Sequence, residues 1–214
     1  MSESMASPSR RREATRQKLL DAAAQVFAEV GLDAASVEEV CERAGFTRGA
    51  FYSNFESKDE LFLELAGRVS LSRVEAVRAR VRALEQDGAL NGGETNALQV
   101  IQQVLDTTAS DRLSVLLMSE IRINALRNPG LAAASLAQED ELLVSVTQIV
   151  DDISRASNLV CALPAADVAR VMLTTWESAS VRAVMAGLNH TQMREFVSAE
   201  LAIVAQLVIR PPQS

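Results

Sequence analysis

Two cations stand where helix electrostatics alone would not place them. Arg48 and Lys58 each fall in the first turn of a predicted helix, where the helix macrodipole favours anions instead. A phosphate or a base acceptor arriving at such a position would be bound by the side chain and the backbone N–H groups together. These residue types therefore point to recognition of an anionic, acceptor-rich partner.

The first of these two helices has two distinct faces. At 100° per residue, Phe51 and Phe55 lie one turn apart and should point into a core, so that Gly49, Ser53 and Tyr52 lie toward the outside. The absence of a side chain at Gly49 would let the helix approach a partner closely. An outward tyrosine indicates a contact surface, because an aromatic side chain stabilises a fold mainly when it is buried. A half-buried surface tyrosine is the alternative.

Residues that could perform covalent or metal chemistry form no pattern in the sequence. His190 is the only histidine, and Cys41 and Cys161 lie far apart. There is no glycine-rich phosphate loop and no nucleophile elbow. We therefore expect neither an enzyme nor a metal or cofactor, with a thiol sensor at Cys161 as the alternative left open.

The elements that position Arg48 begin with a helix predicted over about residues 11–30, with Gly31 as its C-terminal stop. Its apolar stripe has helical spacing. The stripe consists of Leu19, Ala23, Val26, Phe27 and Val30. A capping box, Ser36-Val-Glu-Glu39, then opens a short helix that ends near Gly45.

A third helix is predicted from a cap at Thr47 to about Phe55. A second capping box, Ser57-Lys-Asp-Glu60, opens a long helix with one apolar face. That face carries Leu61, Leu65, Val69 and Val77. Two short helices joined by a tight glycine-containing turn are typical of a helix-turn-helix.

The run from Thr15 to Leu65 resembles the N-terminal domain of the tetracycline-repressor (TetR) family of bacterial transcription regulators. The matching features are the A-x-x-x-F-x-x-x-G segment, the AGF-T-x-G-A turn and the FY-x-x-F-x-x-K-x-x-L ending, over about a quarter of the chain. The resemblance implies a homodimer that binds a palindromic double-stranded DNA operator, with each recognition helix in the major groove. It also implies a C-terminal domain whose small-molecule effector releases the DNA.

The resemblance further implies DNA-binding residues wherever the motif matches. The positions that face bases are Arg48, Gly49, Ala50 and Tyr52. The positions that touch the DNA backbone are Ser36, Thr47, Ser53, Asn54 and Lys58. The family often shows an aromatic residue and a histidine where this chain has Ser53 and Asn54, which offer less stacking area. From its own chemistry, an arginine at position 48 could bond both acceptors of a guanine.

The charge balance of the chain is acidic. Its 214 residues carry a formal net charge of −7, with a pI of about 4.9, which argues against a broadly basic, non-specific nucleic-acid binder. We expect acidic groups such as Glu38 and Glu42 to face away from DNA or to repel non-cognate sequences. A local basic run is either a solvated tail or a phosphate-seeking arm. It comprises Arg10, Arg11, Arg12, Arg16 and Lys18.

Composition predicts an all-α fold with two domains. The prolines and glycines fall between periodic segments, and most aromatic residues lie within residues 27–62, which predicts a small N-terminal domain and a larger helical one. The boundaries are a disordered tail at 1–9, a helix-turn-helix DNA-binding domain at 10–56, a connecting helix at 57–85 and an effector-binding and dimerisation domain at 86–214. No apolar run approaches the ~20 residues of a membrane span, and two cysteines form no disulfide framework. We therefore expect a cytoplasmic protein.

The larger part is predicted to be a set of helices separated by breaks at residues 87–96, Asn128-Pro129-Gly130 and Leu163-Pro164. The helices lie at about 97–109, 111–127, 131–154, 165–188 and 191–209. The last two are apolar on two sides, so each needs a second packing partner, which a second copy would supply as an intermolecular four-helix bundle. The resemblance puts the dimer interface on the same helices. The alternative is a buried hairpin in a monomer.

Polar groups set among apolar ones are the candidates for effector contact. Methionine and tryptophan in the lining would suit a hydrophobic effector of drug-like size. The candidate residues are Met118, Ile121, Arg122, Gln148, Met172, Thr175 and Trp176. We thus expect a ligand-responsive repressor, the alternatives being an activator or a helical small-molecule-binding protein with a secondary DNA-binding role.

Overall fold

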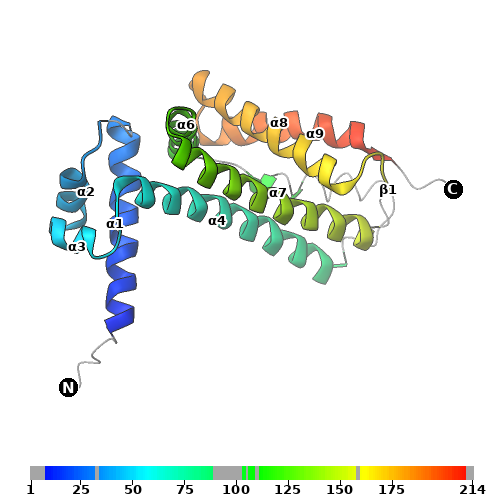
Figure 1. Cartoon of the computed structure of the whole chain (residues 1–214). Helices are drawn as coiled ribbons and strands as arrows, with labels where there is room; N and C mark the ends of the chain where they lie inside the picture. The colour runs from blue at the N-terminus through cyan, green and yellow to red at the C-terminus, as the bar shows by residue number, and fades with distance from the viewer. Residues whose placement is uncertain are drawn as a thin grey trace. The chain divides into compact units, whose positions relative to one another are not determined.

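The computed structural model describes residues 8–31, 34–88, 103–104, 106–108, 111–157 and 160–210. The chain is built of helices, which confirms the all-α prediction (Figure 1). In order they are α1 (Pro8–Val30), α2 (Val37–Ala44), α3 (Arg48–Tyr52), α4 (Lys58–Gln86), the 3₁₀ turn η2 (Asp106–Thr108), α6 (Arg112–Arg127), α7 (Pro129–Ser157), α8 (Ala165–Met185) and α9 (His190–Val208). Most of the predicted tail, of the predicted loop at 87–96 and of the predicted helix at 97–109 lies outside the described residues, although residues 103–104 are helical and residues 106–108 form η2.

One pair of very short strands was not predicted. β1 (Val160–Cys161) and β2 (Ile209–Arg210) pair antiparallel, with Val160 opposite Arg210. Two residues are too short for an alternating pattern to appear in a sequence. Cys161, which precedes the predicted break at Leu163-Pro164, therefore has its backbone in a strand.

The described residues divide into two compact units. The first takes in those up to Arg68 and Leu116–Ser135, and the second takes in those from Val69 to Val115 and from Leu136 onward. Three helices (α4, α6 and α7) therefore have residues in both units. In the described part of the chain, no helix is both long and apolar enough to cross a membrane.

The core of the first unit is aromatic, as its composition predicts. Phe27 and Phe62 are buried with ring centroids 3.9 Å apart, and Phe51 and Phe55 are buried with centroids 5.6 Å apart. The predicted stripe of α1 is buried except at its end, where Val30 is 47% exposed. Val30 is the last residue of α1.

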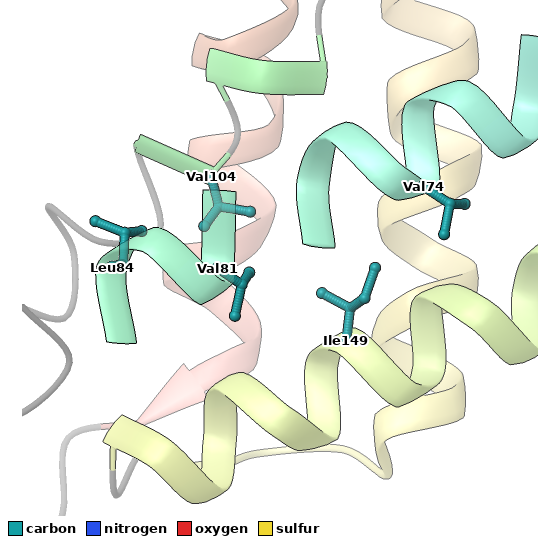
Figure 2. Packing of buried hydrophobic residues seen from close by; sticks show 5 residues of the cluster. All are labelled: Val74, Val81, Leu84, Val104 and Ile149. Carbon is teal, nitrogen blue, oxygen red and sulfur yellow. The ribbon is translucent and has the colours of Figure 1, made fainter. Parts of the chain in front are cut away.

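The second unit packs through aliphatic side chains. Between α4 and α7, Val74, Val81 and Leu84 form one cluster with Val104 and Ile149 (Figure 2). A second cluster joins α8 to α9, and a third adds a residue of α6. The second consists of Ala179, Val197, Leu201 and Ala205, and the third of Val115, Ala183 and Met193. One apolar side of α8 and one of α9 are therefore buried within the chain.

The capping box that opens α2 is present as predicted. The Ser36 hydroxyl accepts a hydrogen bond from the Glu39 backbone N–H at 3.2 Å, and the Glu39 carboxylate accepts one from the Ser36 N–H at 2.8 Å. At the start of α4 the box is displaced by one residue. Ser57 accepts from the Glu60 N–H at 3.1 Å, but the Glu60 carboxylate accepts from the N–H of Glu56, at 2.6 Å.

The α2 box predicts a pH-dependent contribution to stability. The bond from the Ser36 N–H holds the pKa of Glu39 below its ordinary value, so the carboxylate stabilises the fold above the ordinary glutamate pKa and loses that effect as pH falls through the lowered one. We expect Glu39→Gln to be less stable than the native chain near pH 7 and equal to it in acid. Urea unfolding at a series of pH values measures this, with Glu42→Gln as the control on the same helix. A difference that does not change with pH would contradict the prediction.

Candidate nucleic-acid interface

A tight turn joins α2 to α3. Gly45 ends α2 in the left-handed region, with φ of +72°, which favours glycine because other residues meet a steric penalty there. The Thr47 hydroxyl caps α3 by accepting from the Ala50 N–H at 3.2 Å. The helix ends at Tyr52 and is shorter than predicted. The helix-turn-helix is therefore formed with the predicted caps.

The two faces of α3 are oriented as predicted. Phe51 is fully buried, whereas Gly49, Ser53 and Tyr52 are exposed. Tyr52 is 51% exposed, and its ring meets the Phe51 ring edge-on, with centroids 5.2 Å apart. One part of the tyrosine thus packs on the core and the other is available to a partner.

Arg48 lies on this exposed surface beside an acidic residue of α2. Its guanidinium is 2.6 Å from the Glu38 carboxylate and 5.9 Å from the centre of the Tyr52 ring. The hydrogen bond with Tyr52 and then the charge of Glu38 raise the pKa of Arg48. The expectation that Glu38 faces away from the DNA-binding surface is therefore wrong. Glu38 lies next to Arg48, the candidate base-reading side chain.

Lys58 has a partner within the chain that the sequence did not reveal. Its ammonium donates to the Ala35 carbonyl at 2.8 Å, and Ala35 directly precedes the Ser36 cap of α2. This contact explains why a cation is tolerated at the start of α4 despite the helix dipole. The half-buried ammonium still lies at the same helix-turn-helix as Ser36 and Thr47.

Asn54 differs from the other eight predicted DNA-binding residues. Its side chain is 6% exposed and donates to the Ala50 carbonyl at 2.8 Å. Ser53 also bonds this carbonyl, its exposed hydroxyl donating at 2.9 Å. The sequence suggested an outward amide, but the structure uses it to close the end of α3.

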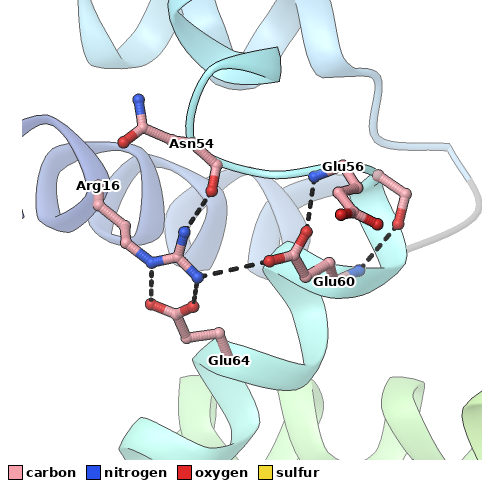
Figure 3. Close-up of polar contacts among 6 residues, drawn as sticks. Arg16, Asn54, Glu56, Glu60 and Glu64 are labelled. Atoms are coloured by element: carbon pink, nitrogen blue, oxygen red, sulfur yellow. Dashed lines mark hydrogen bonds and ion pairs between the residues drawn. The ribbon is translucent and has the colours of Figure 1, made fainter. Parts of the chain in front are cut away.

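The basic run of α1 is divided by the structure. Arg10, Arg11, Arg12 and Lys18 are exposed along the helix, and none of them belongs to a tail, because α1 begins at Pro8. Arg16 instead points inward and binds Glu64, Glu60 and the carbonyl of Asn54 (Figure 3). The hydrogen bond with Glu64 raises the pKa of Arg16. Arg16 is thus removed from any phosphate-seeking arm.

The seven candidate effector contacts fall in both units. Met118, the buried Ile121 and the exposed Arg122 belong to the first. In the second, Gln148 is exposed and bonds Asp152, and Thr175 is half-buried. The half-buried Met172 and Trp176 pack against the cluster between α8 and α9. Two of the seven therefore contribute to the packing of that helix pair.

The potentially reactive side chains are dispersed. Within the described residues, no three His, Cys, Asp or Glu side chains are grouped as a metal site. His190 is exposed at the start of α9. Cys41 is buried, which raises the pKa of its thiol, and the half-buried Cys161 lies 3.4 Å from the Ser154 hydroxyl.

Known proteins match this chain most clearly around the helix-turn-helix. Residues 19–65 match the family described as "Bacterial regulatory proteins, tetR family". The chain is 32% identical over 108 residues to the HTH-type transcriptional regulator AcrR of Shigella flexneri, which is 50% of this chain and 47% of that protein. It is 42% identical over 67 residues to the HTH-type transcriptional repressor Rv1474c of Mycobacterium tuberculosis, covering 31% and 35% of the two chains. A third relative, FasR of Mycolicibacterium smegmatis, is named an activator, with 38% identity over 33% of this chain and 32% of that protein.

These curated relatives are matched over about half of their length or less. Each of the three is named as a regulator of transcription and none as an enzyme. The whole fold has solved counterparts. A TetR transcription regulator from Haloarcula marismortui superimposes with a TM-score of 0.70 at 14% identity, over 92% of this chain and 100% of that one.

The exposure of Arg48 and Glu38 predicts that their pairing contributes little to folding. The two side chains are 61% and 56% exposed, and solvent screens such pairs. We expect Arg48→Gln and Glu38→Gln to leave the free energy of unfolding within experimental error of the native value. Phe51→Ala, on the buried face of the same helix, should lower it by about 3–5 kcal/mol. Denaturant unfolding of the three variants measures this, and a comparable loss in Glu38→Gln would refute it.

Proposed function

We propose that the chain is a transcription regulator of the tetR family of bacterial regulatory proteins, which binds a palindromic DNA operator as a homodimer, represses transcription and is released by a small hydrophobic effector. The observation that carries this proposal is the division of α3, whose Phe51 is buried while Arg48 and Tyr52 are presented outward. A short helix of this kind, set at the end of a glycine turn, fits the major groove.

In this proposal some residues of the helix-turn-helix contact bases and others contact phosphates. Arg48, Gly49, Ala50 and Tyr52 face the bases, with Arg48 bonding the two acceptors of a guanine. Ser36, Thr47, Ser53 and Lys58 contact the phosphates and set the register of the protein on the duplex. The buried Asn54 shapes the end of α3 instead.

The acidic net charge supports selective binding. A chain of −7 is repelled by DNA unless the match is good. Glu38 strengthens this selection, because Arg48 must exchange an existing carboxylate partner for a base. Exposed ion pairs are weak, so a guanine in the right place is sufficient to complete the exchange. Binding should therefore require the operator sequence and low to moderate salt.

The division of roles in α3 and α4 can be tested with Arg48→Ala and Lys58→Ala. We expect Arg48→Ala to lose roughly tenfold of the preference for operator over random DNA. Lys58→Ala should weaken both kinds of DNA alike and reduce the salt slope by about one. Gel shifts with the DNA upstream of the coding region, titrated with salt and with random competitor, measure both. Equal losses of preference in the two variants would refute the assignment.

The same gel shift tests the proposal as a whole. The native chain should prefer its operator over random duplex, and a hydrophobic effector should abolish the complex. A binding protein with no regulatory role would show no preferred sequence. A promoter fusion then separates repression from activation, since deleting the gene raises transcription in the first case and lowers it in the second. We place this activity in the cytoplasm, where the free thiols of Cys41 and Cys161 stay reduced.

We propose that the dimer forms through α8 and α9. Their facing sides are packed together within the chain, yet Ile203 and Leu207, one turn apart on α9, remain 57% and 75% exposed. With Ala199, also exposed, they form a stripe at four-residue spacing. An apolar stripe of this kind is stabilised by a second copy of the same helix pair.

This interface predicts that Leu207→Glu will be monomeric. A charge in the most exposed large side chain of the stripe must be desolvated on association, so sedimentation should show the variant at half the native mass, with its operator affinity lost. Leu126→Glu is the matched control, because Leu126 is 83% exposed on α6 and should stay dimeric. A dimeric Leu207→Glu chain would exclude α9 from the interface.

A further inference from the structure

We propose that Arg16 is a positioning residue for DNA reading: without touching DNA, it fixes the end of α3 against α1 and α4. The inference depends on the proposed function for its consequence and on the geometry of the first unit for its mechanism. The residues involved are Arg16, Asn54, Phe55, Glu60 and Glu64 (Figure 3). We call this set the Arg16 clamp.

The guanidinium of Arg16 is bound on all sides. Its Nε donates to one oxygen of Glu64 at 2.7 Å, and an Nη donates to the other oxygen. The same Nη lies 3.5 Å from a Glu60 oxygen. The remaining Nη donates to the backbone carbonyl of Asn54. The flat group also lies over the Phe55 ring, 4.2 Å from its centroid.

This arrangement joins three elements through one side chain. Arg16 comes from α1, both glutamates come from the first turns of α4, and Asn54 and Phe55 follow the C-cap of α3. The Asn54 amide in turn donates to the Ala50 carbonyl at 2.8 Å. A movement of Asn54 is therefore passed to Ala50, which lies among the proposed base-facing positions.

Only an arginine can make these contacts together. Its five donors lie in one rigid plane, so a bidentate carboxylate contact leaves a donor for a carbonyl on the other edge. The Arg16 side chain is 22% exposed, and its donors are directed at the glutamates and the carbonyl rather than outward. A phosphate could reach it only by displacing these partners.

The Arg16 clamp predicts that removing a carboxylate will weaken DNA binding, which is the opposite of the usual effect. Removing a carboxylate normally strengthens DNA binding, because repulsion from the phosphates falls. Removing the charge of Glu64 should weaken operator binding instead, because Arg16 then holds Asn54 less firmly. Glu42 on α2 is an exposed carboxylate outside the clamp, so Glu42→Gln is the matched control.

The experiment compares Glu64→Gln, Arg16→Lys and Glu42→Gln in the full-length chain. We expect the first two to bind the operator about tenfold more weakly with an unchanged salt slope, and Glu42→Gln to bind equally or more tightly. A phosphate contact by Arg16 would behave differently. Arg16→Lys would then be near native, because lysine also binds phosphate, and Glu64→Gln would bind more tightly. Either of those two results overturns the proposal.

A second measurement does not depend on DNA. In the native chain the N–H groups of Asn54 and Phe55 both donate to the Phe51 carbonyl, at 2.8 and 2.9 Å. We expect their hydrogen exchange to be about tenfold faster in Arg16→Lys and Glu64→Gln and unchanged in Glu42→Gln, with α9 unaffected in all three. Unchanged exchange at both amides overturns the clamp even if no operator is found. A native chain that prefers no DNA sequence, with exchange altered as expected, counts against the proposed function alone.

Discussion

The burial of Phe51 is the constraint on which the candidate site depends. α3 has only five residues, far fewer than an isolated helix needs to persist in water, so its shape is imposed by the core beneath it. Phe51 and Phe55 insert into the first unit and thereby determine which side chains remain outside. Arg48 and Tyr52 are exposed because the opposite face of the helix is occupied.

The helices and the two faces of α3 could be predicted because their causes are local. A capping serine, a glycine stop or an apolar repeat acts within a few residues, and each is visible in the sequence. The break at Asn128 is an example, since its side chain accepts from the Gly130 N–H at 3.1 Å and so opens α7. A reciprocal cap between Asn189 and Gln192 opens α9 by the same local means.

The features that escaped prediction have distant causes. Arg16 binds Glu64, which is 48 positions away in the sequence, and Lys58 binds the Ala35 carbonyl, which is 23 positions away. The residues next to either cation give no indication of its partner. Asn54 lies two residues beyond α3, where either an inward or an outward amide satisfies the local pattern. The effector candidates stay a prediction, because a lining is defined by elements that meet only after folding.

The exposed pair of Arg48 and Glu38 has an evolutionary consequence. The side chains that would read DNA contribute little to the core, while Phe51 and Phe55 hold the helix in place whatever stands on its outer face. Substitutions at positions 48, 49 and 50 can therefore accumulate without loss of the fold, and a duplicated gene can acquire a new target sequence in a few steps. Asn54 does not share this tolerance of substitution, because its side chain is buried and bonds the Ala50 carbonyl.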